Sequence, residues 1–162
     1  MAASEKDLFE RFKKLGIETQ TVRHSPMFTV EDGIGVIDHI PGGHCKSLFL
    51  KDKKAALWLV VVLGATRLDM KSLQPKIASA RLSFAKADLM RDVLGVEPGS
   101  VTPFCVINQT AAAVQVVLDQ SMMDYDILNY HPLSNDATTS IRSPDLITFL
   151  ADCGHHPMII AV

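Results

Sequence analysis

The sequence predicts an α+β fold formed by a single domain, residues 1–162. A chain of 162 residues has the usual size of one domain and can bury a hydrophobic core without disulfides or metals. The predicted helices and strands are interspersed without the regular alternation of a doubly wound fold, which favours a mixed, mostly antiparallel sheet with surrounding helices. Residues 46–64 support this prediction, because two apolar runs on either side of a lysine-rich turn are typical of a β-hairpin.

The first predicted element is an amphipathic helix that begins at a cap formed by Ser4 and Asp7. Gly16 stands where a helix favourably ends. The apolar face of this helix consists of Leu8, Phe9, Phe12 and Leu15. Residues 17–25 alternate like a short strand, and residues 29–40 predict a second helix after a Thr29 cap. The apolar positions of that second helix are Val30, Ile34 and Ile37.

The hairpin is followed by further helices and strands. Its second strand, within residues 55–64, is apolar on both faces and should therefore lie deep in a sheet. Helices are then predicted at residues 71–78 and 86–95, and strands at 81–85, 104–108, 114–120, 125–132, 137–142 and 157–162. Ser143 and Pro144 begin a last helix, since a cap residue followed by proline is a helix-start signal, and Gly154 ends it.

Composition excludes several classes of protein. Apolar residues make up 48% and charged residues 21% of the chain, which is ordinary for a globular protein. The net charge of −2 excludes a generally basic surface that coats nucleic acid, but a local basic patch can still hold one end of an RNA. No apolar run approaches the roughly 20 residues of a membrane helix, so we expect a cytoplasmic protein that does not enter the membrane.

The cysteines and histidines do not form a metal-binding pattern. Cys45, Cys105 and Cys153 are odd in number and far apart, so free thiols are expected. His155 and His156 lie too close to Cys153 for a zinc site without a second cluster of ligands. We therefore expect neither a metal nor a cofactor.

Lys46 occupies an unusual position at the start of the hairpin. Strand alternation places it on the same face as Leu48 and Leu50, whereas Ser47 and Phe49 point to the opposite face. An ammonium group on an otherwise apolar face either extends to the edge of the sheet or lines a pocket, where it meets an anion or a carbonyl oxygen. Both readings remain open from these residues alone.

Two loops also combine small and polar residues. Residues 99–103 begin with Gly99 and end with Pro103, and such a loop either exposes backbone N–H groups to an ester or a ribose or simply connects two elements. Residues 131–139 carry hydrogen-bonding side chains that either form a site or belong to an ordinary turn. These side chains are His131, Asn135, Thr138 and Thr139.

Five stretches together resemble one family over nearly the whole chain. They are residues 24–32 (HSPMFTVED), 42–54 (GGHCKSLFLKDKK), 99–103 (GSVTP), 106–108 (VIN) and 130–141 (YHPLSNDATTSI). In order and spacing they resemble the YbaK/ProX family of free-standing aminoacyl-tRNA deacylases, which is similar to the editing domain of bacterial prolyl-tRNA synthetases. Residues 42–54 and 131–135 look most like the branch that removes alanine from proline tRNA.

The resemblance implies a YbaK-like fold, hydrolysis of mischarged Ala-tRNA(Pro), and the acceptor end of tRNA(Pro) as the partner. It also implies that Lys46 is the catalytic residue and that the turn lysines at 51–54 are solvated or contact phosphates weakly. The substrate-binding residues it implies are Met27, Phe28, Thr29, Gly99, Ser100, Val101, Thr102, Pro103, Asn108, His131 and Asn135. The ester is already activated by its vicinal hydroxyl, so positioning water and stabilising an oxyanion are sufficient for hydrolysis. His131 is an alternative base.

Two alternatives remain from the sequence. The chain either removes another small residue, such as cysteine or serine, or is a silent RNA-binding module of the same fold. Lys46 together with the intact loop 99–103 argues against the silent module, because a binder needs neither. The sequence leaves open the acceptor-stem bases, the oligomeric state and stable association with prolyl-tRNA synthetase.

Overall fold

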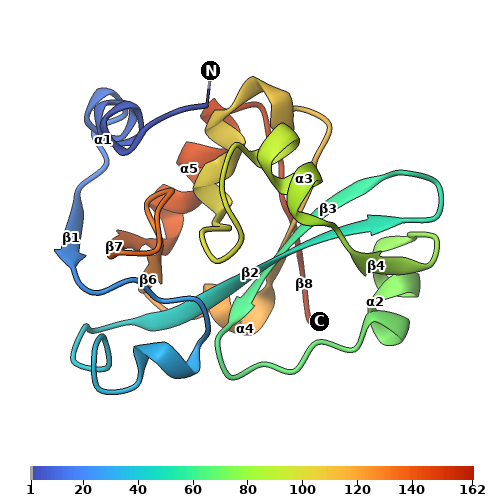
Figure 1. Cartoon of the computed structure of the whole chain (residues 1–162), viewed down its shortest axis with the longest axis horizontal. Helices are drawn as coiled ribbons and strands as arrows, with labels where there is room; N and C mark the ends of the chain where they lie inside the picture. Colours follow the sequence, from blue (N-terminus) through green and yellow to red (C-terminus); the bar gives the residue numbers. More distant parts are fainter. Residues whose placement is uncertain (1) are drawn as a thin grey trace.

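The computed structural model describes residues 2–162, which form one mixed β-sheet with helices packed on both faces (Figure 1). The strands are β1 Thr19–Arg23, β2 Gly43–Asp52, β3 Leu57–Leu63, β4 Leu82–Phe84, β5 Gln115–Asp119, β6 Ile127–Tyr130, β7 Ala137–Arg142 and β8 Met158–Ile160. The α-helices are α1 Glu5–Lys14, α2 Met70–Ile77, α3 Ala87–Leu89, α4 Gln120–Met123 and α5 Ser143–Asp152. Short 3-10 segments are η1 Glu31–Gly33, η3 Pro103–Ile107 and η4 Gln109–Ala111, and a π-helical segment, η2 Met90–Leu94, continues α3. The α+β prediction is confirmed.

The sheet has the strand order β1-β7-β6-β2-β3-β5-β8, and β4 also pairs with β2. The β1–β7, β6–β7, β2–β3 and β2–β4 pairs are antiparallel. The β2–β6, β3–β5 and β5–β8 pairs are parallel. Strand β2 is therefore the central strand, and β6 and β4 share the edge of β2 that lies opposite β3 (Figure 1).

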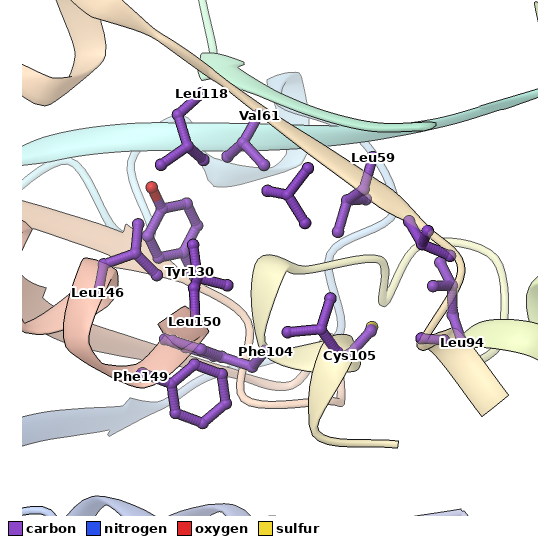
Figure 2. Packing of buried hydrophobic residues seen from close by; sticks show 14 of the residues in the cluster. Leu59, Val61, Leu94, Phe104, Cys105, Leu118, Tyr130, Leu146, Phe149 and Leu150 are labelled. Carbon is purple, nitrogen blue, oxygen red and sulfur yellow. The ribbon is translucent and has the colours of Figure 1, made fainter. Parts of the chain in front are cut away.

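The sheet separates two hydrophobic cores. The larger core contains Leu59 and Val61 of β3 and the rings of Phe104, Tyr130 and Phe149 (Figure 2). The smaller core is covered by α2 and contains the alternate residues of β3, which are Trp58, Val60 and Val62. All five of these β3 side chains are buried, which confirms the prediction that this strand is apolar on both faces because both faces are covered.

Helix α1 begins as the sequence predicts. The hydroxyl of Ser4 accepts a hydrogen bond from the backbone N–H of Asp7 at 3.2 Å, and the Ser4 N–H donates to the Asp7 carboxylate at 2.9 Å. This reciprocal pair satisfies backbone donors that have no partner inside the helix. Leu15 is the C-cap, and Gly16 follows with a φ of +71°.

The lysine-rich turn between β2 and β3 is held by a buried carboxylate. Asp52 accepts hydrogen bonds from the N–H groups of Lys54 at 2.9 Å, Ala56 at 3.0 Å and Ala80 at 3.1 Å. Burial by itself raises the pKa of Asp52, but the bonds from Ala56, Ala80 and Lys54 outweigh this effect and lower it. The adjacent Lys53 and Lys54 stay exposed, as expected for a solvated turn.

Residues 104–108 do not form the predicted strand. Residues 103–107 instead form η3, a 3-10 helix that begins at Pro103 after Thr102, whose hydroxyl accepts the N–H of Phe104 at 3.4 Å. The apolar run is explained by burial, because the Phe104 ring packs edge-on against Tyr130 and Phe149 with centroids 5.6 and 5.5 Å apart. A short apolar run can be a buried helix as easily as a strand.

Residues 29–40 do not form the predicted second helix either. The segment contains a single 3-10 turn, η1, followed by turns. Thr29 still acts as a cap, since its hydroxyl accepts the N–H of Asp32 at 3.3 Å. Gly35 has a φ of +76°, a left-handed conformation that interrupts helical geometry. Within residues 2–162 no helix has both the length and the apolar character needed to cross a bilayer.

Candidate functional site

A cavity of about 450 Å³ lies beside β2, on the edge that β6 and β4 share. Its walls come from β2 itself, from residues 27–38, from the loop at Gly99 and Val101, and from the end of β6 at His131. Thr138 of β7, Phe84 of β4, Gly64 and Met90 also line it. This volume suits a small-molecule group, since ligand sites commonly measure 300–1,000 Å³. Segments that are far apart in the sequence therefore converge on one hollow.

Lys46 lies on the wall of this cavity and is half-buried. The salt bridges within residues 2–162 are formed by Arg11, Arg23 and Arg91, so Lys46 has no acidic partner among the described residues. Asp38 lines the same cavity, but its carboxylate accepts the backbone N–H of Gly35 at 2.7 Å. The Lys46 ammonium is therefore available to an oxygen of a ligand.

His131 lines the cavity directly after β6 and has a defined ring orientation. Its Nδ1 lies 3.1 Å from the carbonyl oxygen of Ala137, and because a carbonyl only accepts, Nδ1 carries the proton. Nε2 then carries a lone pair. Burial lowers the pKa of His131 below its ordinary value, which favours the neutral ring. The structure thus provides a neutral hydrogen-bond acceptor at the cavity wall.

Residues 27–29 form the third wall. The Met27 N–H donates to the Asn135 carbonyl oxygen at 2.9 Å, and the Met27 side chain is buried. Phe28 and Thr29 also line the cavity, and their N–H groups donate to the Asp32 carboxylate at 2.9 and 3.1 Å. Phe28 itself is 68% exposed, so its ring stands at the rim rather than in the core.

The cavity contains seven of the twelve predicted site residues. They are Lys46, Met27, Phe28, Thr29, Gly99, Val101 and His131. The other five, Ser100, Thr102, Pro103, Asn108 and Asn135, do not line it. Thr102 is fully buried as the cap of η3, and Pro103 is buried behind it. Ser100 is also buried, and its N–H donates to the Glu97 carbonyl oxygen at 3.0 Å.

Asn108 has its side-chain amide occupied by main-chain groups. Its Nδ2 donates to the carbonyl oxygens of Leu94 at 2.9 Å and Cys105 at 3.2 Å, and its Oδ1 accepts the N–H of Ala3 at 2.7 Å. These bonds join the end of η3 to the segment before α1 and to the last residue of η2. The structure therefore places Asn108 in a connecting role behind the cavity. Asn135 likewise connects two walls, because its carbonyl holds Met27 while its amide lies close to Gly99.

Sequence reasoning named Thr138 only as part of a polar stretch that forms either a site or a turn, and it missed Phe84. Thr138 is buried on the cavity wall, and its hydroxyl lies 2.8 Å from Nε2 of His24. His24 Nδ1 lies 2.8 Å from the Ser25 carbonyl oxygen and so carries the proton, which means that Nε2 accepts the Thr138 hydroxyl proton. Both residues belong to the stretches that carry the family resemblance, which was the available signal. Phe84 had no comparable signal.

Side chains of Asn129 and His44 hold the start of β2 and the residues just before it. Asn129 Nδ2 donates to the carbonyl oxygens of Pro41 at 3.0 Å and Gly43 at 3.2 Å. His44 Nε2 lies 2.8 Å from the Ile40 carbonyl oxygen and donates to it. These bonds fix the chain just before Lys46, so the point from which the Lys46 side chain enters the cavity is set by the backbone that precedes it.

The cysteines are poor nucleophiles in this fold. Burial raises the pKa of Cys45 to about 12, although Cys45 lines the cavity, and raises that of Cys105 to about 12. Burial also raises the pKa of Cys153 to about 11. A thiol rather than a thiolate is therefore present at neutral pH. Among residues 2–162 no group of three or more histidine, cysteine, aspartate or glutamate side chains is arranged to hold a metal ion.

Comparisons with known proteins give a consistent result. A family model described as the aminoacyl-tRNA editing domain matches residues 24–149. Prolyl-tRNA synthetase associated domain-containing protein 1 of Danio rerio is 35% identical over 158 residues, which cover 96% of this chain and 86% of that protein. The prolyl-tRNA editing protein ProX of Acetoanaerobium sticklandii is 35% identical over 141 residues, which cover 84% of each chain.

The fold has a match among solved structures. The crystal structure of a proposed trans-editing enzyme for prolyl-tRNA synthetase superposes with a TM-score of 0.76 at 16% identity, covering 99% of this chain and 97% of that one. Because the family model spans most of the chain and the sequence relatives extend over still more of it, the chain belongs to the aminoacyl-tRNA editing domain family.

Proposed function

We propose that this protein is a trans-editing hydrolase that removes alanine from mischarged tRNA(Pro) in the cytoplasm. The observation that supports the proposal most directly is Lys46, an ammonium group without an acidic partner on the wall of a 450 Å³ cavity. The aminoacylated end of a tRNA presents an ester carbonyl, ribose hydroxyls and a phosphate, and each of these offers oxygens to an ammonium group. The family and the ProX relative support the same class of substrate.

The reaction needs a positioned water more than a protein nucleophile. Water adds to the ester carbonyl, the C–O bond to the ribose breaks, and the products are free alanine and the tRNA hydroxyl. Lys46 stabilises the negative charge that develops on the carbonyl oxygen, and such stabilisation is often the largest contribution to catalysis. The vicinal ribose hydroxyl assists the water, as the chemistry of the ester suggests. The raised pKa of the Cys45 thiol supports a mechanism without a covalent intermediate.

His131 serves in this mechanism as a neutral hydrogen-bond acceptor. Its Nδ1–H is held by the Ala137 carbonyl, so Nε2 is free to accept a hydrogen bond from water or from a substrate hydroxyl. The lowered pKa of His131 keeps this nitrogen unprotonated at neutral pH. We assign it a role in orienting the substrate.

Alanine is favoured over proline by the size of the site. Met27 and Phe28 line the same cavity as Lys46, and Phe28 contacts Gly99, so we expect this wall to limit the space for the amino-acid side chain. Proline carries a ring closed onto its nitrogen, and a steric clash rejects such a group more strongly than a small difference in affinity does. The exposed lysines at residues 51–54 add a local positive charge that attracts tRNA phosphates despite the net charge of −2.

The decisive experiment is a deacylation assay with purified protein and tRNA(Pro) charged with alanine, proline, serine or cysteine. Rapid release of alanine with protection of proline is the expected result. Faster release of serine or cysteine than of alanine would show that alanine is not the preferred amino acid. No release from any of the four would defeat the proposed activity. Addition of prolyl-tRNA synthetase in a second series tests whether that enzyme is a partner, through a change in rate or co-elution.

A further inference from the structure

Strand β2 has an uncovered edge inside the cavity. On one side it pairs with β3 along Cys45–Lys51, but on the other side β6 pairs only with Gly43 and His44, and β4 only with Leu50, Lys51 and Asp52. Residues 45–49 therefore have no partner strand on this side, and all of them line the cavity. The two neighbouring strands lie at opposite ends of β2 and leave the gap between them (Figure 1).

The direction of the backbone groups along this gap follows from hydrogen bonds at its two ends. The N–H of Gly64 donates to the His44 carbonyl at 2.8 Å, and the N–H of Asp52 donates to the Ala56 carbonyl at 3.0 Å, so the even-numbered residues of β2 bond to the β3 side. In an antiparallel pair the direction of the backbone N–H and C=O groups alternates from one residue to the next. The odd-numbered residues of β2 therefore direct these groups to the side away from β3. The Phe49 carbonyl follows this rule, since it accepts the N–H of Ala85 at 2.9 Å.

Ser47 is the residue in the middle of the gap. It stands opposite Val61 in the pair with β3, and within residues 2–162 neither its N–H nor its carbonyl oxygen has a hydrogen-bond partner on the open side. It follows Lys46 directly in β2, so the two free backbone groups and the Lys46 side chain belong to the same stretch of the cavity lining. An unpaired strand edge is a template for another extended chain.

We propose that the aminoacyl group of the substrate binds to the backbone of Ser47 as a single residue added to the sheet. An α-aminoacyl ester has the same N–Cα–C=O skeleton as a residue of a β-strand. In a hydrogen-bonded antiparallel pair, each residue donates its N–H to the other's carbonyl oxygen. The substrate ammonium would donate to the Ser47 carbonyl oxygen, and the Ser47 N–H would donate to the ester carbonyl oxygen. This inference rests on the proposed function and assigns the position of the substrate within that site.

The same geometry disfavours proline because its nitrogen is part of a ring, independently of the size of the residue. In a strand residue the N–H points sideways toward the neighbouring strand, and in proline the ring carbon Cδ occupies that direction. The remaining protons of a prolyl ammonium point elsewhere, so the ring carbon rather than a donor would face the Ser47 carbonyl. An uncovered strand edge therefore selects a primary amine over a cyclic one, in addition to any exclusion by the wall at Phe28.

The test compares Ser47→Pro with Ser47→Ala in the full chain. Proline at 47 removes the N–H without breaking a bond of the sheet, and edge positions of strands tolerate proline. Ser47→Ala keeps the backbone and measures the contribution of the hydroxyl. We expect kcat/KM for Ala-tRNA(Pro) to fall at least about tenfold further in Ser47→Pro than in Ser47→Ala, as the loss of a hydrogen bond to a charge-bearing transition state requires. Equal losses in the two variants would overturn the inference.

A second measurement does not depend on the folding of Ser47→Pro. Adenosine carrying alanine through a 3′-amide in place of the ester is a non-hydrolysable probe, and the prolyl amide is its matched control. By NMR, the alanyl probe should slow hydrogen exchange of the Ser47 amide and shift its resonance, and the prolyl probe should do so less. Binding of the alanyl probe with no change at Ser47 would overturn the inference. Failure of the wild type to release alanine from tRNA(Pro) would instead defeat the proposed function.

Discussion

The ring of Phe28 packs directly against Gly99. A Cβ built on Gly99 would lie 3.1 Å from Cδ1 of Phe28 and 3.6 Å from Nδ2 of Asn135, so the glycine allows two walls of the cavity to touch. The φ of Gly99 is +91°, a conformation that residues with a side chain rarely adopt. This contact joins two segments that are far apart in the sequence and that both line the cavity.

Gly99→Ala should therefore impair both the loop and the activity. The positive φ should cost about 1–2 kcal/mol of the free energy of unfolding, measured by urea denaturation. The new methyl group should also displace Phe28 or the loop, and misplacement of a substrate-binding wall should lower kcat/KM by about tenfold or more. Gly16→Ala is a matched control, because Gly16 has a φ of +71° with no atom within 4 Å of the added Cβ. Gly16→Ala should lose stability and retain activity, and an equal loss of activity in both variants would contradict this role for Gly99.

Lys46→Ala should abolish deacylation without unfolding the protein. A half-buried lysine at the cavity wall adds little to the core, so the free energy of unfolding should change by less than about 1 kcal/mol. Loss of its charge stabilisation should lower kcat by about 100-fold or more. Single-turnover deacylation of Ala-tRNA(Pro) provides the measurement. A folded Lys46→Ala protein with turnover near that of the wild type would disprove the assignment.

Lys53→Ala provides the matched control for the removal of a lysine charge. Lys53 is exposed in the β2–β3 turn, so its only expected contribution is attraction of tRNA phosphates. Activity should change by about twofold or less, and the difference from wild type should shrink as salt rises, because salt screens exposed charges. A large loss that persists at high salt would show that the catalytic lysine lies in the turn.

Stability should fall as the pH is lowered through the range in which histidine titrates. Burial lowers the pKa of His131 below its ordinary value of 6.5, and burial also lowers the pKa of His155. The unfolded chain therefore takes up protons first, so the histidine contribution is fully present above about pH 6.5 and is lost as the pH falls toward the lowered values. Urea denaturation between pH 7.5 and about pH 5 gives the slope.

Variants distinguish the contribution of each histidine to this slope. His131→Gln and His155→Gln should each make the free energy of unfolding less dependent on pH, because each removes a group that binds a proton more readily in the unfolded chain. His39→Gln is the control, since His39 is exposed on the loop before β2. A slope that is unchanged in both buried-site variants would contradict the burial of these rings.

The strands of the central sheet were predictable because their residues alternate or are apolar on both faces. The strand predicted at residues 104–108 was wrong, yet Thr102 and Pro103 form the same cap-and-proline signal that predicted α5. Helix α5 does begin at Ser143, but its N-cap is Arg142 and no side chain caps it. The apolar run outweighed that signal, and periodicity cannot separate a short buried helix from a strand. The helix predicted at residues 29–40 was also wrong, because helical spacing of apolar residues was given more weight than the two glycines. Its apolar spacing was helical, but Gly35 adopts a left-handed conformation and the segment lies over a cavity rather than on a core.

The site could be predicted only as far as its sequence motifs extended. The motifs identified Lys46, Gly99 and His131, and the structure brings these three residues to one cavity. The open edge at Ser47 had no sequence signal, because it exists only where the short β6 and β4 both fail to cover β2. Pairing between distant strands sets that gap, and such pairing cannot be seen in local periodicity.

Met27 and Phe28 form the wall of the cavity that we propose excludes proline. Phe28→Ala should raise hydrolysis of Pro-tRNA(Pro) relative to Ala-tRNA(Pro), because the ring stands at the rim of the cavity and its loss widens the opening. Since Phe28 is 68% exposed, stability should hardly change. Met27→Ala should relax the exclusion too. Met27 is buried and packs closely on Gly33, with its Cε 2.9 Å from where a Cβ on Gly33 would lie. Its truncation should therefore also lower the free energy of unfolding by about 2–5 kcal/mol.

Relaxation in Phe28→Ala should be partial if the uncovered edge at Ser47 also selects against a cyclic amine. Both substrates must therefore be assayed side by side for the wild type, Phe28→Ala, Met27→Ala and Ser47→Pro. If Phe28→Ala and Met27→Ala leave the ratio of Pro-tRNA(Pro) to Ala-tRNA(Pro) hydrolysis unchanged, proline is excluded by the strand edge at Ser47 alone. Equal hydrolysis of both substrates by the wild type would mean that neither wall nor edge excludes proline, so that protection of Pro-tRNA(Pro) must come from a partner of this chain.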